Sequence, residues 1–152
     1  MAVTGYWYPQ CIVRFGMADF DWVADSASMK CALMNTAFTG ANQSLSLADF
    51  WNDVSSYEAS GTGYTAGGKT IGTTACAVGS TSNKTVKFSG GTSTVWSTAT
   101  ITARGAVVYK AVAAASDSPV VFFLDFGADV VATAGDFTIT WNTDGMATIT
   151  TA

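Results

Sequence analysis

A glycine-rich run at residues 61–70, GTGYTAGGKT, contains the residue types of a phosphate-binding loop. Four of its residues match the pattern G-x-x-x-x-G-K-[ST]: Gly63, Gly68, Lys69 and Thr70. In such loops, backbone N–H groups and a lysine surround the phosphates of a bound nucleotide. Later in the chain, Asp125 ends the apolar run VVFFL, as does the carboxylate that holds magnesium in these enzymes. A nucleoside triphosphatase is therefore one hypothesis.

The segments on either side of the run argue against that hypothesis. A phosphate-binding loop must follow a strand and open a helix, because the helix N-terminus supplies the N–H groups. Here residues 46–57 have helical periodicity, and residues 71–76, IGTTAC, are poor helix formers. We therefore expect residues 61–68 to form a turn region and Lys69 to be a surface charge at the start of a strand.

Other patterns for catalysis or metal binding are weak. The chain has no histidine, which removes Ser-His-Asp and Cys-His catalysis and most zinc sites. Cys11, Cys31 and Cys76 lack zinc-type spacing, and we expect three small buried apolar side chains there. A calcium loop needs a spacing of ligands that is absent around Asp19, Asp21 and Asp25. A glycosidase needs a pair of carboxylates, and no spacing selects such a pair among Glu58, Asp117, Asp125 and Asp136. We expect them to be solvated turn carboxylates, and we predict no catalytic residue, cofactor or metal.

Charge and composition point away from nucleic acid and membranes. The chain has 7 basic and 11 acidic residues, a net charge of -4, whereas nucleic-acid binding needs a basic face. The longest strongly apolar run, residues 120–124, is far shorter than the roughly 20 residues of a spanning helix. Residues 1–10 lack the basic and apolar regions of a signal peptide. Only 12% of residues are charged, which suits a protein that packs against neighbours.

The hydrophobic pattern predicts a mainly β chain with one short helix. Residues 46–57, SLADFWNDVSSY, place their apolar side chains on one helical face, with Ser46 as the cap. Short runs rich in β-branched and aromatic residues predict strands at 29–34, 86–88, 94–110, 120–126, 137–141 and 147–151. Gly105 marks either a bulge or a bend between two strands. We predict a single-domain β-sandwich or flattened barrel that the helix partly covers.

Residues 1–10 are predicted to form an extended aromatic arm in front of a single β-rich domain over residues 11–152. Pro9 disfavours a helical conformation in the residue before it. Clustered aromatic side chains can fill a core or anchor a partner, and both interpretations stay open here. The candidate interface residues are Tyr6, Trp7, Tyr8 and Pro9.

Three segments resemble, in the same order, a family of small virion structural proteins of tailed bacteriophages. Residues 52–69, NDVSSYEASGTGYTAGGK, are similar to the SxYExSGTGYTAGG run that follows a short helix in that family. Residues 99–110, ATITARGAVVYK, resemble its next pair of strands. Residues 123–141, FLDFGADVVATAGDFTITW, resemble its GDFTIxW ending. The resemblance covers roughly two-thirds of the chain, and the first 45 residues match less well.

The resemblance implies a place in the virion and no chemistry, and in that family the glycine run is a loop. We expect a capsid decoration or cement protein on the outer head surface, assembled in the host cytoplasm. Its partners would be the major capsid protein and copies of itself, with trimers at three-fold positions as one arrangement. One alternative is a tail, neck or baseplate component. An alternative of another class is a carbohydrate-binding module that uses exposed tryptophans for stacking, the candidates being Trp7, Trp22, Trp96 and Trp141.

Overall fold

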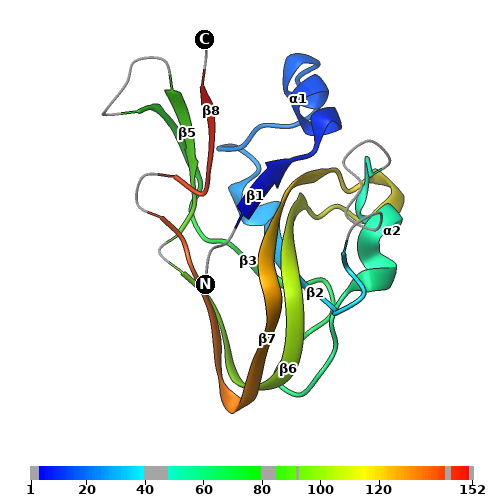
Figure 1. The fold of residues 1–152 in the computed structure, drawn as a ribbon. Helices are drawn as coiled ribbons and strands as arrows, with labels where there is room; N and C mark the ends of the chain where they lie inside the picture. Colours follow the sequence, from blue (N-terminus) through cyan, green and yellow to red (C-terminus); the bar gives the residue numbers. More distant parts are fainter. Residues whose placement is uncertain (1–3, 40–47, 80–84, 92, 143–144, 151–152) are drawn as a thin grey trace.

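The computed structural model describes residues 4–39, 48–79, 85–91, 93–142 and 145–150 and is mainly β (Figure 1). Strands make up 52% and helices 16% of the structure. The strands form two antiparallel sheets that pack as a single β-sandwich-like domain, which confirms the predicted fold class.

The first sheet has the strand order β1-β7-β6-β2-β3 and the second has the order β4-β5-β8. The strands of the first sheet are β1 (Thr4–Trp7), β2 (Met29–Met34), β3 (Lys69–Thr70), β6 (Ser93–Lys110) and β7 (Val120–Thr140). Those of the second are β4 (Ala75–Val78), β5 (Thr85–Ser89) and β8 (Ala147–Thr150). The described residues also contain two α-helices, α1 (Pro9–Gly16) and α2 (Trp51–Val54), and short 3-10 turns at Ser26–Ser28, Ser55–Tyr57 and Ala115–Asp117.

A long two-stranded ribbon of β6 and β7 runs through the molecule and folds back on itself. The strands pair from Ser93↔Thr140 to Tyr109↔Val120, and the bend in the middle of the ribbon is the lowest part of Figure 1. Register shifts interrupt the pairing around the turn, and Thr98 and Ala134 have φ angles of 53° and 51° there. These shifts and the left-handed residues bend the ribbon, as bulges do in other sheets.

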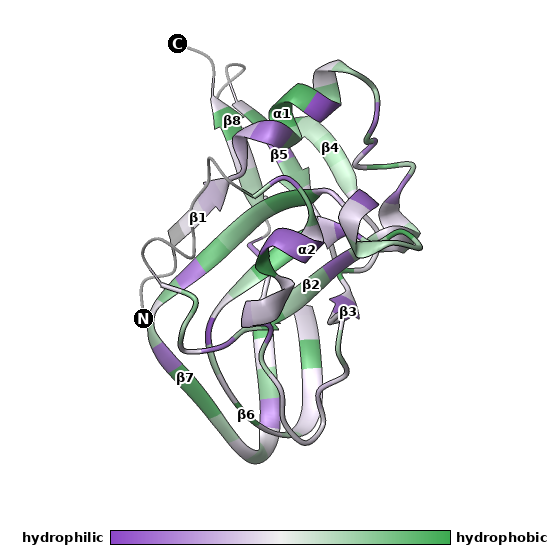
Figure 2. Cartoon of the chain, turned by 90° about the vertical axis from the view of Figure 1, so that its right-hand side faces the viewer, coloured by the Kyte–Doolittle hydropathy of each residue, from purple (hydrophilic) through white to green (hydrophobic). Residues whose placement is uncertain are grey.

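Both faces of the first sheet are covered. Its inner face belongs to an aromatic core between the limbs of the bent ribbon, built on Trp22, Trp96, Phe122, Phe126 and Phe137. Its outer face lies under α2, as the turned view in Figure 2 shows. There the ring of Trp51 stacks on Tyr109, with 4.4 Å between ring centroids and 7° between planes. Burial on both faces explains why the strand sequence VVFFL is a continuous apolar run.

The predicted helix over residues 46–57 is shorter in the structure. Residues 46–47 lie outside the described residues, Phe50 forms an isolated bridge with Pro119, and the helix spans only Trp51–Val54. Asp53 provides the cap, because its Oδ2 accepts hydrogen bonds from the backbone N–H groups of Asp49 and Phe50 at 2.9 and 3.0 Å. Phe50 has an extended backbone, with φ -128° and ψ 164°, so the helix cannot begin before Trp51.

The other differences concern β7 and Gly105. The separate strands predicted at 120–126 and 137–141 are parts of one strand, because β7 remains paired with β6 through the bend. Gly105 sits at a register shift, which confirms a bulge rather than a break between strands. A Cβ atom there would lie 2.5 Å from the carbonyl oxygen of Leu124, so the close approach of β7 requires glycine.

The expected N-terminal arm is integrated into the domain. Strand β1 pairs with β7, with Tyr6 opposite Phe123 and Trp7 opposite Phe122. Pro9 begins α1, where the missing N–H of proline costs nothing, and this helix was not predicted. The boundary expected at residue 10 therefore has no counterpart in the packing of the described residues.

We expect Tyr8→Ala to destabilise the fold much more than Tyr6→Ala. Tyr8 is fully buried, whereas Tyr6 is 41% exposed and rests on one side of Phe123. Removing a buried aromatic ring leaves a cavity and costs about 3–5 kcal/mol, whereas the exposed ring should cost about 1 kcal/mol. Urea unfolding of the two variants measures both values. Equal losses of stability would show that β1 is not packed as described.

Candidate interaction surface

The glycine-rich run forms a clasp across β6 and β2, and we use this name for residues 58–68. Thr62 pairs with Thr100, whose N–H donates to the carbonyl oxygen of Thr62 at 2.9 Å. A Cβ atom on Gly61 would overlap the carbonyl oxygen of Thr100, and one on Gly68 would overlap that of Cys31. The glycines are therefore needed because the clasp lies directly against the backbone of two strands.

Glu58 and Tyr64 hold the clasp in place through a compact hydrogen-bond network. Glu58 Oε1 accepts from the hydroxyl of Tyr64 at 2.7 Å and from the N–H of Gly67 at 2.6 Å. The Tyr64 oxygen in turn accepts from the N–H of Leu33 at 3.0 Å. The Tyr109 hydroxyl donates to the carbonyl oxygen of Gly67 at 2.8 Å. Every polar group of this partly buried network thus has a partner within the fold.

This geometry removes the structural basis of the phosphate-loop hypothesis. The run follows a 3-10 turn and leads into β3, so no helix N-terminus is aimed at its glycines. Strand β3 begins at Lys69, as expected, and Lys69 Nζ donates to the carbonyl oxygen of Val95 at 2.8 Å. The lysine and glycines of the pattern therefore contact the protein's own backbone.

Burial controls the protonation of the tyrosines around the clasp. It raises the pKa of Tyr64 well above the ordinary value, and the hydrogen bond to Glu58 raises it further. Burial also raises the pKa of Tyr109 to about 12. Both hydroxyls act as hydrogen-bond donors, and they therefore stay protonated to a more alkaline pH than an exposed tyrosine does.

The four candidate interface residues occupy different environments. Tyr8 is buried, and Trp7 is half-buried, with its indole Nε1 donating to the carbonyl oxygen of Thr148 at 3.1 Å. Tyr6 and Pro9 remain exposed. Only the latter two can contact a partner without a rearrangement of the fold, and the interface role of the four residues stays a prediction.

Three of the four tryptophans considered for carbohydrate stacking are in the core. Trp22, Trp96 and Trp141 are at most 6% exposed. A sugar ring needs an open aromatic face, so these three residues cannot provide stacking platforms in this fold.

The cysteines only partly match the prediction. Cys11 and Cys31 are buried as expected, and burial raises the pKa of Cys11 to about 12. Cys76 is exposed on β4, which corrects the prediction for that residue. Its neighbours Ala75, Ala77 and Val78 are exposed as well, because β4 is an edge strand.

Glu58 lies in the partly buried network of the clasp, which corrects the prediction of a solvated turn carboxylate there, whereas other carboxylates are used in turns and ion pairs. Hydrogen bonds from the N–H groups of Ala24 and Val23 lower the pKa of Asp21, which caps a turn. Asp25 pairs with Lys110 at 2.9 Å. Among the residues that the structure describes, no group of three potential ligands could hold a metal ion.

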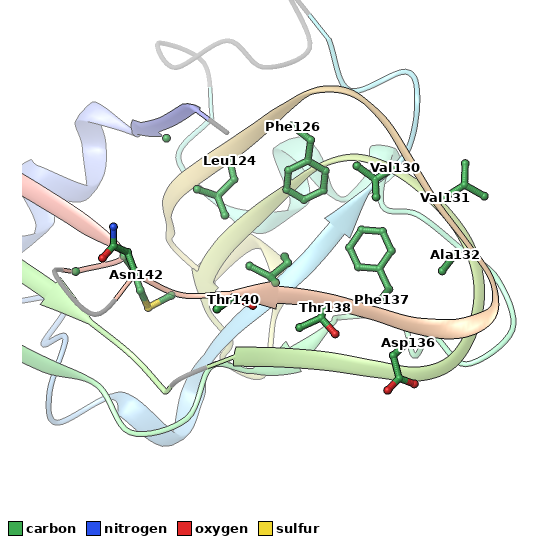
Figure 3. A pocket seen from close by; sticks show the side chains of 14 residues that line it. Leu124, Phe126, Val130, Val131, Ala132, Asp136, Phe137, Thr138, Thr140 and Asn142 are labelled. Carbon is green, nitrogen blue, oxygen red and sulfur yellow. The ribbon is translucent and has the colours of Figure 1, made fainter. Parts of the chain in front are cut away.

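An apolar groove of about 730 Å³ opens beside the bent ribbon. Figure 3 shows Leu124, Phe126 and Phe137 in the space between the limbs of β7. Asp136 lies at its border, where its Oδ1 accepts from the N–H of Thr98 at 3.2 Å and so stabilises the bend. The polar groups of the groove do not converge on a common point, so its aromatic walls serve the core.

The second sheet presents a different surface, which sequence reasoning missed. Ile12 and Val23, both exposed, line a narrow apolar groove with Cys76 and Ile149, between α1 and the second sheet. Val78, on the same edge as Cys76, is 63% exposed. The sequence signal was the run ACAV, four small uncharged residues bounded by polar ones.

Comparisons with protein-family models, curated proteins and solved structures find no match to the chain. Within the described ranges, no helix is long and apolar enough to cross a membrane.

We expect Gly68→Ala to destabilise the protein by about 2–5 kcal/mol, because the new Cβ meets backbone and the φ angle of +68° is left-handed. The matched control is Gly16→Ala at the end of α1, where a Cβ meets no atom within 4 Å. The control should change stability by about 0.5 kcal/mol or less. Chemical denaturation measures both, and a Gly68→Ala variant as stable as the control would refute the clasp.

The buried tyrosines predict a loss of stability at alkaline pH. The pKa of Tyr64 is higher in the folded state than its unfolded value of about 10, so its contribution is complete below pH 10 and declines above it. Each such group lowers the free energy of unfolding by up to about 1.4 kcal/mol per pH unit. Between pH 8 and pH 11, the free energy of unfolding measured in urea should therefore decline less steeply for Tyr64→Phe than for the unmodified protein. Identical declines would contradict a protonated, buried Tyr64.

Proposed function

We propose that this chain is a non-enzymatic structural protein of a tailed-bacteriophage particle, and specifically a capsid decoration or cement protein on the outer head surface. The main support is the role of the residues that carry the resemblance. Glu58, Gly61, Tyr64 and Gly68 of the SxYExSGTGYTAGG run form the clasp that closes the fold. Because these residues hold the backbone of the fold together, a resemblance at them indicates a shared architecture more strongly than one at residues without such contacts.

The surface supports a role in protein contacts. The apolar groove beside β4 is lined by Asp21 as its one acidic residue and by aliphatic, aromatic and cysteine side chains elsewhere. The net charge of -4 suits a surface turned away from packaged DNA. The partners in this proposal are the major capsid protein and further copies of the chain.

We expect quantitative mass spectrometry of purified particles to find this protein in a simple lattice ratio to the major capsid protein. Heads separated from tails serve as the control fraction, because a decoration protein stays with the heads. Enrichment in the tail fraction at a few copies per particle would favour the tail, neck or baseplate alternative. Absence from both fractions would overturn the assignment to the particle.

A further inference from the structure

The two edges of the second sheet differ in what covers them. At the β8 edge, the indole Nε1 of Trp7 donates to the carbonyl oxygen of Thr148, so a side chain from the N-terminal strand occupies part of this edge. At the other edge, β4 has no further strand beside it in the described part of the chain, and all four of its residues are exposed. Natural proteins protect such edges with charges, proline or bulges. Strand β4, Ala75–Val78, contains none of these.

The pairing of β4 with β5 determines which backbone groups face the open edge. The N–H of Gly79 donates to Thr85, directly opposite in the ladder, at 2.6 Å. In an antiparallel ladder the bonded and non-bonded pairs alternate, so Ala75 and Ala77 also direct their groups toward β5. Cys76 and Val78 therefore present their N–H and C=O groups outward.

These two outward residues are complementary to a second copy of themselves. A two-fold axis perpendicular to the sheet must place one residue opposite its own copy. If the axis passes through Ala77, Cys76 of each copy lies opposite Val78 of the other copy. In each of these two Cys76–Val78 pairs, the N–H of either residue donates to the C=O of the other. Four backbone hydrogen bonds then form. With Cys76 at the axis, only the Cys76 pair is bonded within β4.

We infer that two copies of this chain associate through antiparallel β4–β4 pairing centred on Ala77, which joins their three-stranded sheets into one. Charge favours this site, because two copies of net charge -4 repel each other and β4 carries no charge. Pairing also buries the exposed side chain of Val78 against Cys76 of the second copy. The contact does not depend on where the protein lies in a particle, so it can be tested on the isolated chain.

The contact is small, so it is best detected by trapping. A pair of four-residue strands buries much less than the roughly 1,200 Å² of a stable complex, and dilute samples should be largely monomeric. A high local concentration, as on a particle surface, would strengthen the pairing.

The decisive variant is Ala77→Cys with Cys76→Ala, in the full-length chain. The two introduced thiols lie opposite each other in a non-bonded pair, with Cα atoms about 4.5 Å apart, which a disulfide can span. Under mild oxidation this variant should form at least about tenfold more disulfide dimer than a collision control. That control is Val112→Cys with Cys76→Ala, because Val112 is exposed in the loop between β6 and β7.

The original chain and one further variant decide the register. Cys76 and its copy are diagonal neighbours about 7–8 Å apart, so the original chain should form no more dimer than the collision control. Adding Val78→Lys to the cross-linking variant should reduce the dimer to the control level, because lysine protects a strand edge. The same change lowers the net negative charge, so general repulsion cannot explain the loss. Thermal unfolding checks that each variant is folded.

Each alternative outcome overturns part of the inference. Efficient cross-linking of the original chain through Cys76, without cross-linking of the Ala77→Cys variant, would place the axis on residue 76 and refute the register. Yields equal to the collision control for both chains would refute the contact itself. A dimer that persists with Val78→Lys would show that the pairing of Val78 with Cys76 does not hold the copies together, and would refute the proposed ladder. None of these results bears on the presence of the protein in the particle.

Discussion

The bend of the β6–β7 ribbon is held in place by a glycine-rich segment that lies directly against it. Gly61 and Thr62 contact Thr100 at the bend, while Gly68 contacts the backbone of Cys31 on β2. One segment therefore joins the bend to the neighbouring strand of the sheet. The aromatic core between the limbs of the ribbon, which includes Trp96 and Phe137, can pack only when the bend is held. The clasp thus connects the bend, and the core that packs inside it, to strand β2.

The clasp also explains why several polar side chains are not available for chemistry at the surface. Residues that in another fold could perform chemistry are used here to hold the backbone: Glu58 and Tyr64 close the clasp, and Lys69 binds a strand carbonyl. Among the described residues, exposed apolar surface includes the outer side of α1 and the unprotected edge at β4. A rigid scaffold with small, weakly charged contact surfaces is suited to repeated association in an assembly, where many weak contacts act together.

The sequence predicted the fold class and most strands because alternating or continuous apolar runs directly reflect burial. It did not predict the bend, because Thr98 and Ala134 adopt left-handed conformations that their residue types do not indicate. It also missed α1, where the aromatic cluster before Pro9 suggested an arm and gave no sign of pairing with β7. For the candidate site, the pattern of Gly63, Gly68, Lys69 and Thr70 identified the right segment and suggested the wrong chemistry. Glycines that approach a phosphate and glycines that approach a strand have the same sequence signature, and only the neighbouring elements distinguish them.

The clasp is a fixed part of the fold, and amide hydrogen exchange can measure how well its hydrogen bonds are maintained. Two amides report on the network, since the N–H of Gly67 is bonded to Glu58 and that of Leu33 to Tyr64. We expect both amides to exchange as slowly as the N–H of Ala59, which is bonded to the carbonyl oxygen of Leu33. We also expect Glu58→Gln to accelerate exchange at Gly67. Rapid exchange at Gly67 and Leu33 in the original chain, with Ala59 still protected, would show that the clasp is not a fixed part of the fold.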